Sequence, residues 1–215
     1  MGVKKINVKF DDAIQYLENG DLALFSWSGF FGNLIKIQTV SNYNHVGVVV
    51  HTNGKYNPPI WEVAEYREFI GSRIVSLQNY VEQNPGKIDI YRHARYNYKY
   101  YFCPQQKRIV EVKVKFEGEK FTECMRKLTG LPYGWSRIFY IWATRIPILR
   151  WFCNYDEILS DLPDEKLISA VCSTSVAHCH SQIGWDSTRN KADKYIEPAD
   201  FARSANLDYI FTLIP

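Results

Sequence analysis

The chain has 215 residues, of which 46% are hydrophobic and 23% are charged, and its formal net charge is +3 at pH 7. These values are typical of one globular domain that buries a sizeable core. The small net charge gives no support for bulk nucleic-acid binding, so we expect no nucleic-acid partner.

The N-terminus and the cysteines indicate a reducing compartment. Residues 1–6 lack the apolar run of a secretory signal. The five cysteines are odd in number and form no CxxC pair, so we expect neither a disulfide framework nor a four-cysteine zinc site. We therefore expect a cytoplasmic protein, or one carried by a phage or virus particle.

The predicted elements mix short helices with short apolar strands, placed by hydrophobic periodicity and by Gly, Pro and Asn signals. In chain order they are a helix at 11–19, a strand at 21–27, a helical piece from 28 to 37, strands at 46–51, 59–64 and 74–77, a helix at 77–84, a strand at 87–91, helices at 103–130, 169–181 and 195–205, and a strand at 209–214.

A predicted β-hairpin brings a histidine and a glutamate together. Asn53-Gly54 is the strongest hairpin signal of the chain, and His45 and Glu62 each lie 8 residues from that turn. Cross-strand neighbours lie about 4.5–5.5 Å apart at Cβ, so the Glu62 carboxylate can reach the ring of His45. Glu65 and Glu68 are close in sequence and could serve in its place.

Cys172 begins a predicted helix downstream of that hairpin. A thiol attacks carbonyl carbon as the thiolate, and an imidazole and a helix N-terminus are the two common ways to stabilise that anion. His45 can hold one ring nitrogen toward the thiolate and the other toward Glu62. These residue types predict a nucleophile, a base and an orienting carboxylate.

The segment from residue 138 to residue 153 is rich in Ile, Trp, Phe and Leu but contains Arg145, Pro147 and Arg150. It is too short and too charged to span a bilayer, so we expect no transmembrane helix. We expect an inserted apolar helical segment at about 136–160 within a single domain of residues 1–215. Its surface could contact a membrane periphery or a protein partner.

Several short motifs follow one another in a characteristic order. They are Gly20-Asp21-Leu22, Asn44-His45-Val46-Gly47-Val48, Trp61-Glu62-Val63-Ala64, Leu131-Pro132-Tyr133-Gly134, Val171-Cys172-Ser173-Thr174-Ser175-Val176 and Glu197-Pro198-Ala199-Asp200-Phe201. Over roughly residues 18 to 206 the chain resembles the circularly permuted NlpC/P60 hydrolases, the YiiX-like group of the papain-like superfamily. In unpermuted members the cysteine helix precedes the histidine strand, and here that order is reversed.

The resemblance implies an α+β, papain-like NlpC/P60 fold with an antiparallel sheet packed against the cysteine-bearing helix. It implies that Cys172 is the nucleophile, His45 the general base and Glu62 the orienting residue, with no cofactor. The chain departs from the family in having Asn44 where Ser is frequent before the histidine, and Thr174 or Ser175 where a carboxylate is frequent after the cysteine.

The predicted cleft surrounds those three residues. Tyr133 is expected to line it or to donate to the oxyanion, alongside the backbone N–H of Cys172. Asn44 and Ser173 neighbour His45 and Cys172 in sequence and are expected to contact substrate.

The predicted activity is a cysteine hydrolase that forms an acyl-thioester and cleaves an amide bond in a peptide, a peptidoglycan stem or an isopeptide. Two alternatives stay open: an ester or lipid acyl hydrolase or acyltransferase on the same triad, and a non-catalytic binding module that kept the fold. His178, Cys179 and His180 are weak evidence for zinc because no second ligand pair accompanies them. Residues 91–101 interleave basic and aromatic side chains, which favours snorkelling over an aromatic face more than nucleic-acid stacking.

Overall fold

The computed structural model describes residues 5–28, 33, 36–37, 39–52, 60–68, 70–134, 171–188, 191 and 193–215, with the backbone alone at 99–102 and at 194. The strands are β1 (Asn7–Lys9), β2 (Leu22–Phe25), β3 (His45–His51), β4 (Trp61–Arg67), β5 (Gly71–Ser76), β6 (Ile88–His93), β7 (Tyr96–Cys103), β8 (Arg108–Lys115) and β9 (Leu207–Ile214). The helices are α1 (Phe10–Ala13), α3 (Leu77–Gln83), α4 (Gly118–Lys127), α8 (Cys172–Gln182) and α9 (Pro198–Arg203), with 3-10 turns η1 (Ile14–Tyr16) and η2 (Asp193–Tyr195).

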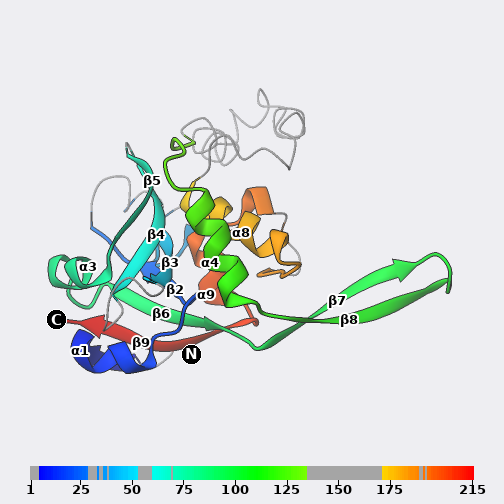
Figure 1. The fold of residues 1–215 in the computed structure, drawn as a ribbon, viewed down its shortest axis with the longest axis horizontal. Helices are drawn as coiled ribbons and strands as arrows, with labels where there is room; N and C mark the ends of the chain where they lie inside the picture. Colours follow the sequence, from blue (N-terminus) through cyan, green and yellow to red (C-terminus); the bar gives the residue numbers. More distant parts are fainter. Residues whose placement is uncertain are drawn as a thin grey trace.

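The described residues form a mixed α+β fold around a 7-stranded sheet of order β1-β9-β6-β2-β3-β4-β5. All neighbours in it pair antiparallel except β1 and β9, which pair parallel. β7 and β8 form a separate ribbon that extends away from the body (Figure 1). The predicted antiparallel sheet is therefore confirmed apart from one parallel edge.

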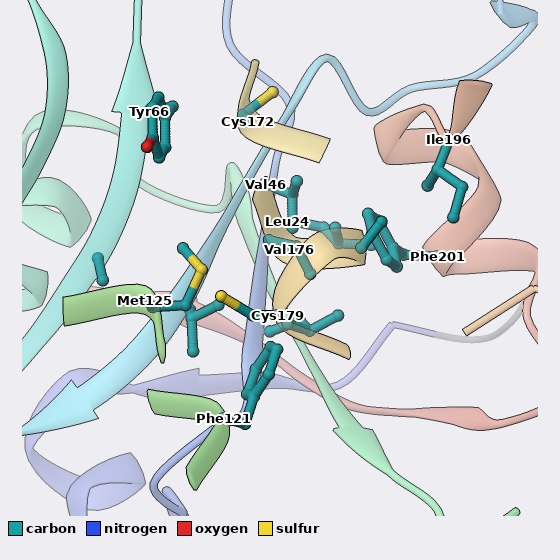
Figure 2. Close-up of a cluster of buried hydrophobic side chains, with 14 of the residues drawn as sticks. Leu24, Val46, Tyr66, Phe121, Met125, Cys172, Val176, Cys179, Ile196 and Phe201 are labelled. Atoms are coloured by element: carbon teal, nitrogen blue, oxygen red, sulfur yellow. The ribbon is translucent and has the colours of Figure 1, made fainter. Parts of the chain in front are cut away.

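The sheet buries a different cluster on each face because successive side chains of a strand point to opposite faces. Val46, Val48 and Val50 of β3 pack toward α4, α8 and α9, together with Phe121 and Val176 (Figure 2). Figure 2 also shows Cys172 at one end of α8, at the margin of this cluster.

The opposite face of the sheet packs against α1 and α3. Phe25, Val49 and Val63 contribute from the strands, and Leu77 and Val81 contribute from α3. Both faces of β2, β3 and β4 are therefore covered, which explains why β2 and β3 are nearly continuous apolar runs.

The predicted helix at 103–130 is wrong over its first half. The structure instead forms β8 over Arg108–Lys115, paired with β7, and the helix α4 begins only at Gly118. Val110, Val112 and Val114 alternate with polar residues, which is the period of a strand, and β-branched side chains favour extended backbone. The polar residues that precede Val110 are typical of a helix start, but this two-residue alternation is the stronger signal.

The pairing of β3 with β4 differs from the predicted register. The structure pairs Val50 with Glu62 and Gly47 with Glu65, so Glu62 lies far from His45 along the ladder. The described ladder places His51 opposite Trp61, which is not the register that a turn centred on Asn53-Gly54 would give. That dipeptide lies outside the described residues, as does the segment at 136–160.

A disulfide joins Cys124 of α4 to Cys179 of α8, with a Cα–Cα distance of 5.6 Å. The expectation of no disulfide is wrong for this pair. Helix packing rather than sequence spacing brings the two sulfur atoms together, because the residues are 55 positions apart. Cys103 and Cys172 are free cysteines of the described chain. None of the described helices is long and apolar enough to cross a membrane.

Gly47 allows β3 and β4 to pair closely beside the buried Glu65. A Cβ added at Gly47 would overlap Cγ1 of Val63 and would lie 3.4 Å from Cβ of Glu65. We expect Gly47→Ala to lower the free energy of unfolding by about 1–3 kcal/mol, as overpacking of a dense core does. Urea denaturation measures the loss.

The matched control is Gly86→Ala, since a Cβ there meets nothing within 4 Å although its φ is +67°. That variant carries only the cost of the left-handed backbone, about 1 kcal/mol. An unchanged free energy of unfolding for Gly47→Ala would contradict the close pairing.

Candidate active site

A buried histidine–glutamate pair lies where β3 and β4 run side by side. Nε2 of His45 is 2.6 Å from Oε2 of Glu65. The two side chains are 1% and 0% exposed, so the contact is shielded from water. A hydrogen bond between charged groups in such surroundings is stronger than one in water.

Glu65 is held by three groups at once. Nε of Arg73, its partner on β5, donates to Oε1 at 2.9 Å, and the hydroxyl of Tyr80 from α3 also donates to Oε1. Arg73 donates in turn to the Tyr80 hydroxyl at 2.6 Å. Burial on its own raises the pKa of Glu65, but His45, Tyr80 and Arg73 together lower it to about 2. Glu65 is therefore a carboxylate at neutral pH.

His45 is the cationic partner of that carboxylate. Burial on its own lowers its pKa, but the nearby charges of Cys172 and Glu65 and the hydrogen bond with Glu65 raise it to about 10. Glu65 occupies Nε2, and the buried Nδ1 has no hydrogen-bond partner among the described residues. Nδ1 is therefore the ring nitrogen left for the Cys172 thiol.

An aromatic ring fixes the plane of the imidazole. Trp27 stacks on His45 with ring centroids 4.7 Å apart and an interplanar angle of 21°. The guanidinium of Arg67 lies 4.0 Å from the Trp27 ring centroid. The π-system of Trp27 therefore attracts both the protonated ring of His45 and the guanidinium of Arg67, and both contacts stabilise its position.

Asn44 supports that tryptophan. Its Oδ1 accepts from Trp27 N at 3.1 Å, and its Nδ2 donates to Trp27 O at 2.9 Å. The residue is 3% exposed. Both polar atoms of the Asn44 amide therefore hold the Trp27 backbone, and the contact of Asn44 with substrate stays a prediction.

Cys172 is the first residue of α8, and it is 6% exposed. The first N–H groups of a helix have no partner within it, and Val171 before the helix has no side-chain acceptor for them. The Thr174 hydroxyl accepts from the Val171 N–H at 3.1 Å, and the Ser175 hydroxyl donates to the Cys172 carbonyl at 2.8 Å. The helix start therefore presents N–H groups and a positive dipole end beside the sulfur.

Tyr133 lies beside the thiol, on the segment that follows α4 and hydrogen-bonds to Ser72 of β5 through Gly130 and Leu131. It is 9% exposed. Burial and then the negative charges of Cys172 and Glu68 raise the pKa of its hydroxyl. The hydroxyl therefore stays protonated and can donate a hydrogen bond.

The structure brings together Cys172, His45 and Tyr133 of the predicted site but not Glu62. Glu62 pairs with Val50 and Ser76 and, by strand alternation, points to the other face of β4 from Glu65. The prediction of Glu62 as the partner of His45 is wrong, and Glu65, the nearby alternative, makes the contact. Ser173 is 3% exposed, and its contact with substrate stays a prediction.

Three supporting residues were not predicted from the sequence. Trp27, Arg73 and Tyr80 come from a strand end, a strand and a helix, and each reaches the site only through the fold. The signal for Arg73 was available in principle. An arginine within a strand needs an acidic partner when it is half-buried, and Glu65 on the neighbouring strand provides one.

Two further histidines form a separate buried pair near the disulfide. Nε2 of His93 lies 2.7 Å from Nε2 of His180, and the rings of Phe116 and Phe121 stack on them. Burial lowers the pKa of His180 to about 3 and that of His93 well below its ordinary value. Both rings are therefore neutral at pH 7.

This histidine pair does not fit a metal ion. Two nitrogen ligands of one tetrahedral zinc, each about 2.0–2.1 Å from the metal, lie roughly 3.3 Å apart. Nε2 of His93 and Nε2 of His180 are only 2.7 Å apart because they share a hydrogen bond. Among the described residues, no group of three or more His, Cys, Asp or Glu side chains could hold a metal.

The comparison with solved structures agrees with this architecture, whereas the two sequence comparisons find no match. No protein-family model matches the chain. No curated protein sequence matches it either. Among solved structures, the crystal structure of the metalloprotein YiiX from Escherichia coli O157:H7, a DUF1105 protein, is similar with a TM-score of 0.56 and 13% identity. The match covers 92% of this chain and 98% of that one, so the chain has a YiiX-like fold.

The contact between Glu65 and His45 predicts a stability that depends on pH. Because the pKa of Glu65 is lowered, its contribution is present above 4.5 and is lost as the pH falls toward about 2. Because the pKa of His45 is raised, its contribution is complete below 6.5 and is lost as the pH rises toward about 10. We expect Glu65→Gln to lower the free energy of unfolding by about 3 kcal/mol between these limits, and by less on either side.

Urea denaturation of the wild type and the variant in acidic, mildly acidic and alkaline buffers measures this window. Glu62→Gln is the matched control, because Glu62 makes no ion pair in the described part of the chain. Equal losses for the two variants, or a loss that does not change with pH, would contradict the buried pair.

Proposed function

We propose that the protein is a cysteine hydrolase in which Cys172 is the nucleophile, His45 the general base and acid, and Glu65 the residue that orients the imidazole. The observation that carries this proposal is the 2.6 Å contact between His45 Nε2 and the buried, ionised Glu65, with the Cys172 thiol against the same ring. Nucleophile, base and orienting carboxylate in contact are the signature of this kind of catalysis.

The chain order supports a circularly permuted NlpC/P60 arrangement as part of the same proposal. The histidine strand β3 precedes the cysteine helix α8 in the chain. α8 packs on the face of the sheet to which Val46, Val48 and Val50 of β3 contribute. The likeness to YiiX concerns the fold and leaves the activity to be tested.

The reaction begins from an ion pair in which Nδ1 of His45 already holds the proton of the Cys172 thiol. The thiolate attacks the substrate carbonyl carbon, and the π electrons of the C=O bond move to oxygen. As the tetrahedral intermediate collapses, the C–N bond breaks and His45 gives its proton to the leaving amine, which leaves an acyl-thioester on Cys172. His45 then takes a proton from water, and the hydroxide adds to the thioester carbon. Collapse of this second tetrahedral intermediate breaks the C–S bond, which releases the acid and returns the Cys172 thiolate beside the protonated His45.

Each stage needs groups that the site supplies. Glu65 keeps the ring of His45 in place and stabilises the imidazolium, whose other nitrogen faces the sulfur. The N–H of Cys172 and the hydroxyl of Tyr133 are the donors available to the oxyanion. Removing one such donor typically costs about 2.7–4 kcal/mol of transition-state stabilisation.

An amide is the substrate class we favour: a peptide, a peptidoglycan stem or an isopeptide. The protonated His45 can donate to a leaving amine, which is the step that an amide requires and an activated ester does not. The same triad serves an ester or lipid acyl group, and profiling against both classes separates them. YiiX is described as a metalloprotein. The donor set of the described residues here does not fit a metal, so the proposed steps use protein groups alone.

Alkylation tests the nucleophile. An ordinary thiol, of pKa about 8.5, is almost fully protonated near pH 6. We expect iodoacetamide at that pH to modify Cys172 at least about 10-fold faster than Cys103, the other free cysteine of the described chain, as mapped by mass spectrometry. We expect Glu65→Gln to slow this labelling about 10-fold and Glu62→Gln to leave it unchanged. Equal rates at Cys172 and Cys103 would refute an activated thiol.

Hydrolysis itself is tested with peptide and acyl-ester substrates. Cys172→Ala should lower turnover at least about 10⁴-fold, and Cys103→Ala should leave it intact. Turnover by Cys172→Ala equal to that of the wild type would overturn the mechanism. Fast alkylation of Cys172 without turnover of any substrate would favour the binding module that kept the fold.

A further inference from the structure

The ribbon of β7 and β8 projects from the body without packing on the main sheet (Figure 1). It is anchored at its base, where Phe116 N donates to Arg95 O and Nδ2 of Asn97 donates to Asp186 O. Beyond this base, β8 is exposed or half-exposed at every position, so neither of its faces belongs to the core. An isolated two-stranded hairpin is at best marginally stable in water, which favours a partner surface.

The ribbon concentrates the positive charge of the molecule. Residues 95–115 contain six Lys and Arg against one Glu, a net of +5, whereas the whole chain is +3. The rest of the chain is therefore net negative. Five of these cations have described side chains, and none of the five forms an ion pair within the described part of the chain: Arg95, Lys107, Arg108, Lys113 and Lys115.

Apolar side chains are exposed on the same ribbon. Ile109 is 70% exposed, Tyr98 is 40% exposed and Val112 is 36% exposed. Aliphatic, tyrosine and basic side chains together are the composition of segments that lie at the boundary between lipid headgroups and acyl chains.

We propose that the β7–β8 ribbon docks the protein on the surface of an anionic lipid bilayer. The cations would meet anionic headgroups, and Ile109 and Val112 would enter the boundary region. Nucleic acid fits less well, because the exposed aliphatic side chains of Ile109 and Val112 bind neither bases nor phosphates. The ring of Tyr96 is also covered by Lys113, whose Nζ lies 3.9 Å from its centroid. Arg95 lies 5.5 Å from the same ring. The proposal is independent of the proposed hydrolysis.

Vesicle co-sedimentation tests the ribbon. We expect the full chain to bind vesicles of phosphatidylcholine mixed with phosphatidylserine, to bind pure phosphatidylcholine weakly, and to release as salt is added. Each basic residue near an anionic surface strengthens binding about fivefold, so Lys107→Gln with Arg108→Gln should weaken it roughly 25-fold. Ile109→Ser should lower the part of the binding that resists salt.

The matched control is Lys120→Gln with Lys127→Gln on α4, which makes the same change of net charge at exposed positions away from the ribbon. We expect it to bind as the wild type does, and circular dichroism verifies that both double variants are folded. Equal weakening by both, or no binding to anionic vesicles, would overturn the proposal. Tight binding to a single-stranded oligonucleotide without vesicle binding, or self-association through the ribbon, would overturn it as well.

Discussion

The contact between Glu65 and His45 is the interaction on which the rest of the site depends. A carboxylate and an imidazolium, 0% and 1% exposed, must satisfy each other because water cannot reach them. That requirement explains why Arg73 and Tyr80 also converge on Glu65, and why Gly47 carries no side chain beside it. The pair fixes the imidazole and leaves one nitrogen toward the thiol.

The sheet provides this arrangement by using its two faces for different tasks. One face packs against α3, which contains Tyr80, and the other packs against α4 and α8, of which α8 contains Cys172. β3 contributes to both clusters because its residues alternate, and His45 stands at its first position. A disulfide and a neutral histidine pair hold α8 in place further along the helix. The reactive end of α8 is therefore supported by a rigid scaffold.

Much of the fold could be predicted from the sequence, because β2, β3 and β9 are largely apolar and α8 begins at a cysteine with helix-start residues. Cys172 and His45 were predicted for the same reason. Glu62 was chosen over Glu65 because the turn signal at Asn53-Gly54 implied a register that differs from the observed pairing of β3 with β4. Glu62 and Glu65 point to opposite faces of β4, and without the register the sequence does not show which of them faces His45. The disulfide and the supporting residues Trp27, Arg73 and Tyr80 depend on tertiary packing, which spacing does not encode.

The protonation of His45 tests the central claim most directly. Nitrogen-15 NMR of the imidazole resolves whether each ring nitrogen carries a proton. The Glu65–His45 pair predicts that both nitrogens of His45 are protonated at neutral pH, consistent with a pKa raised to about 10, and that Glu65→Gln shifts the titration downward while Glu62→Gln does not. A neutral ring at pH 7 in the wild type, or an unchanged titration in Glu65→Gln, would contradict the account.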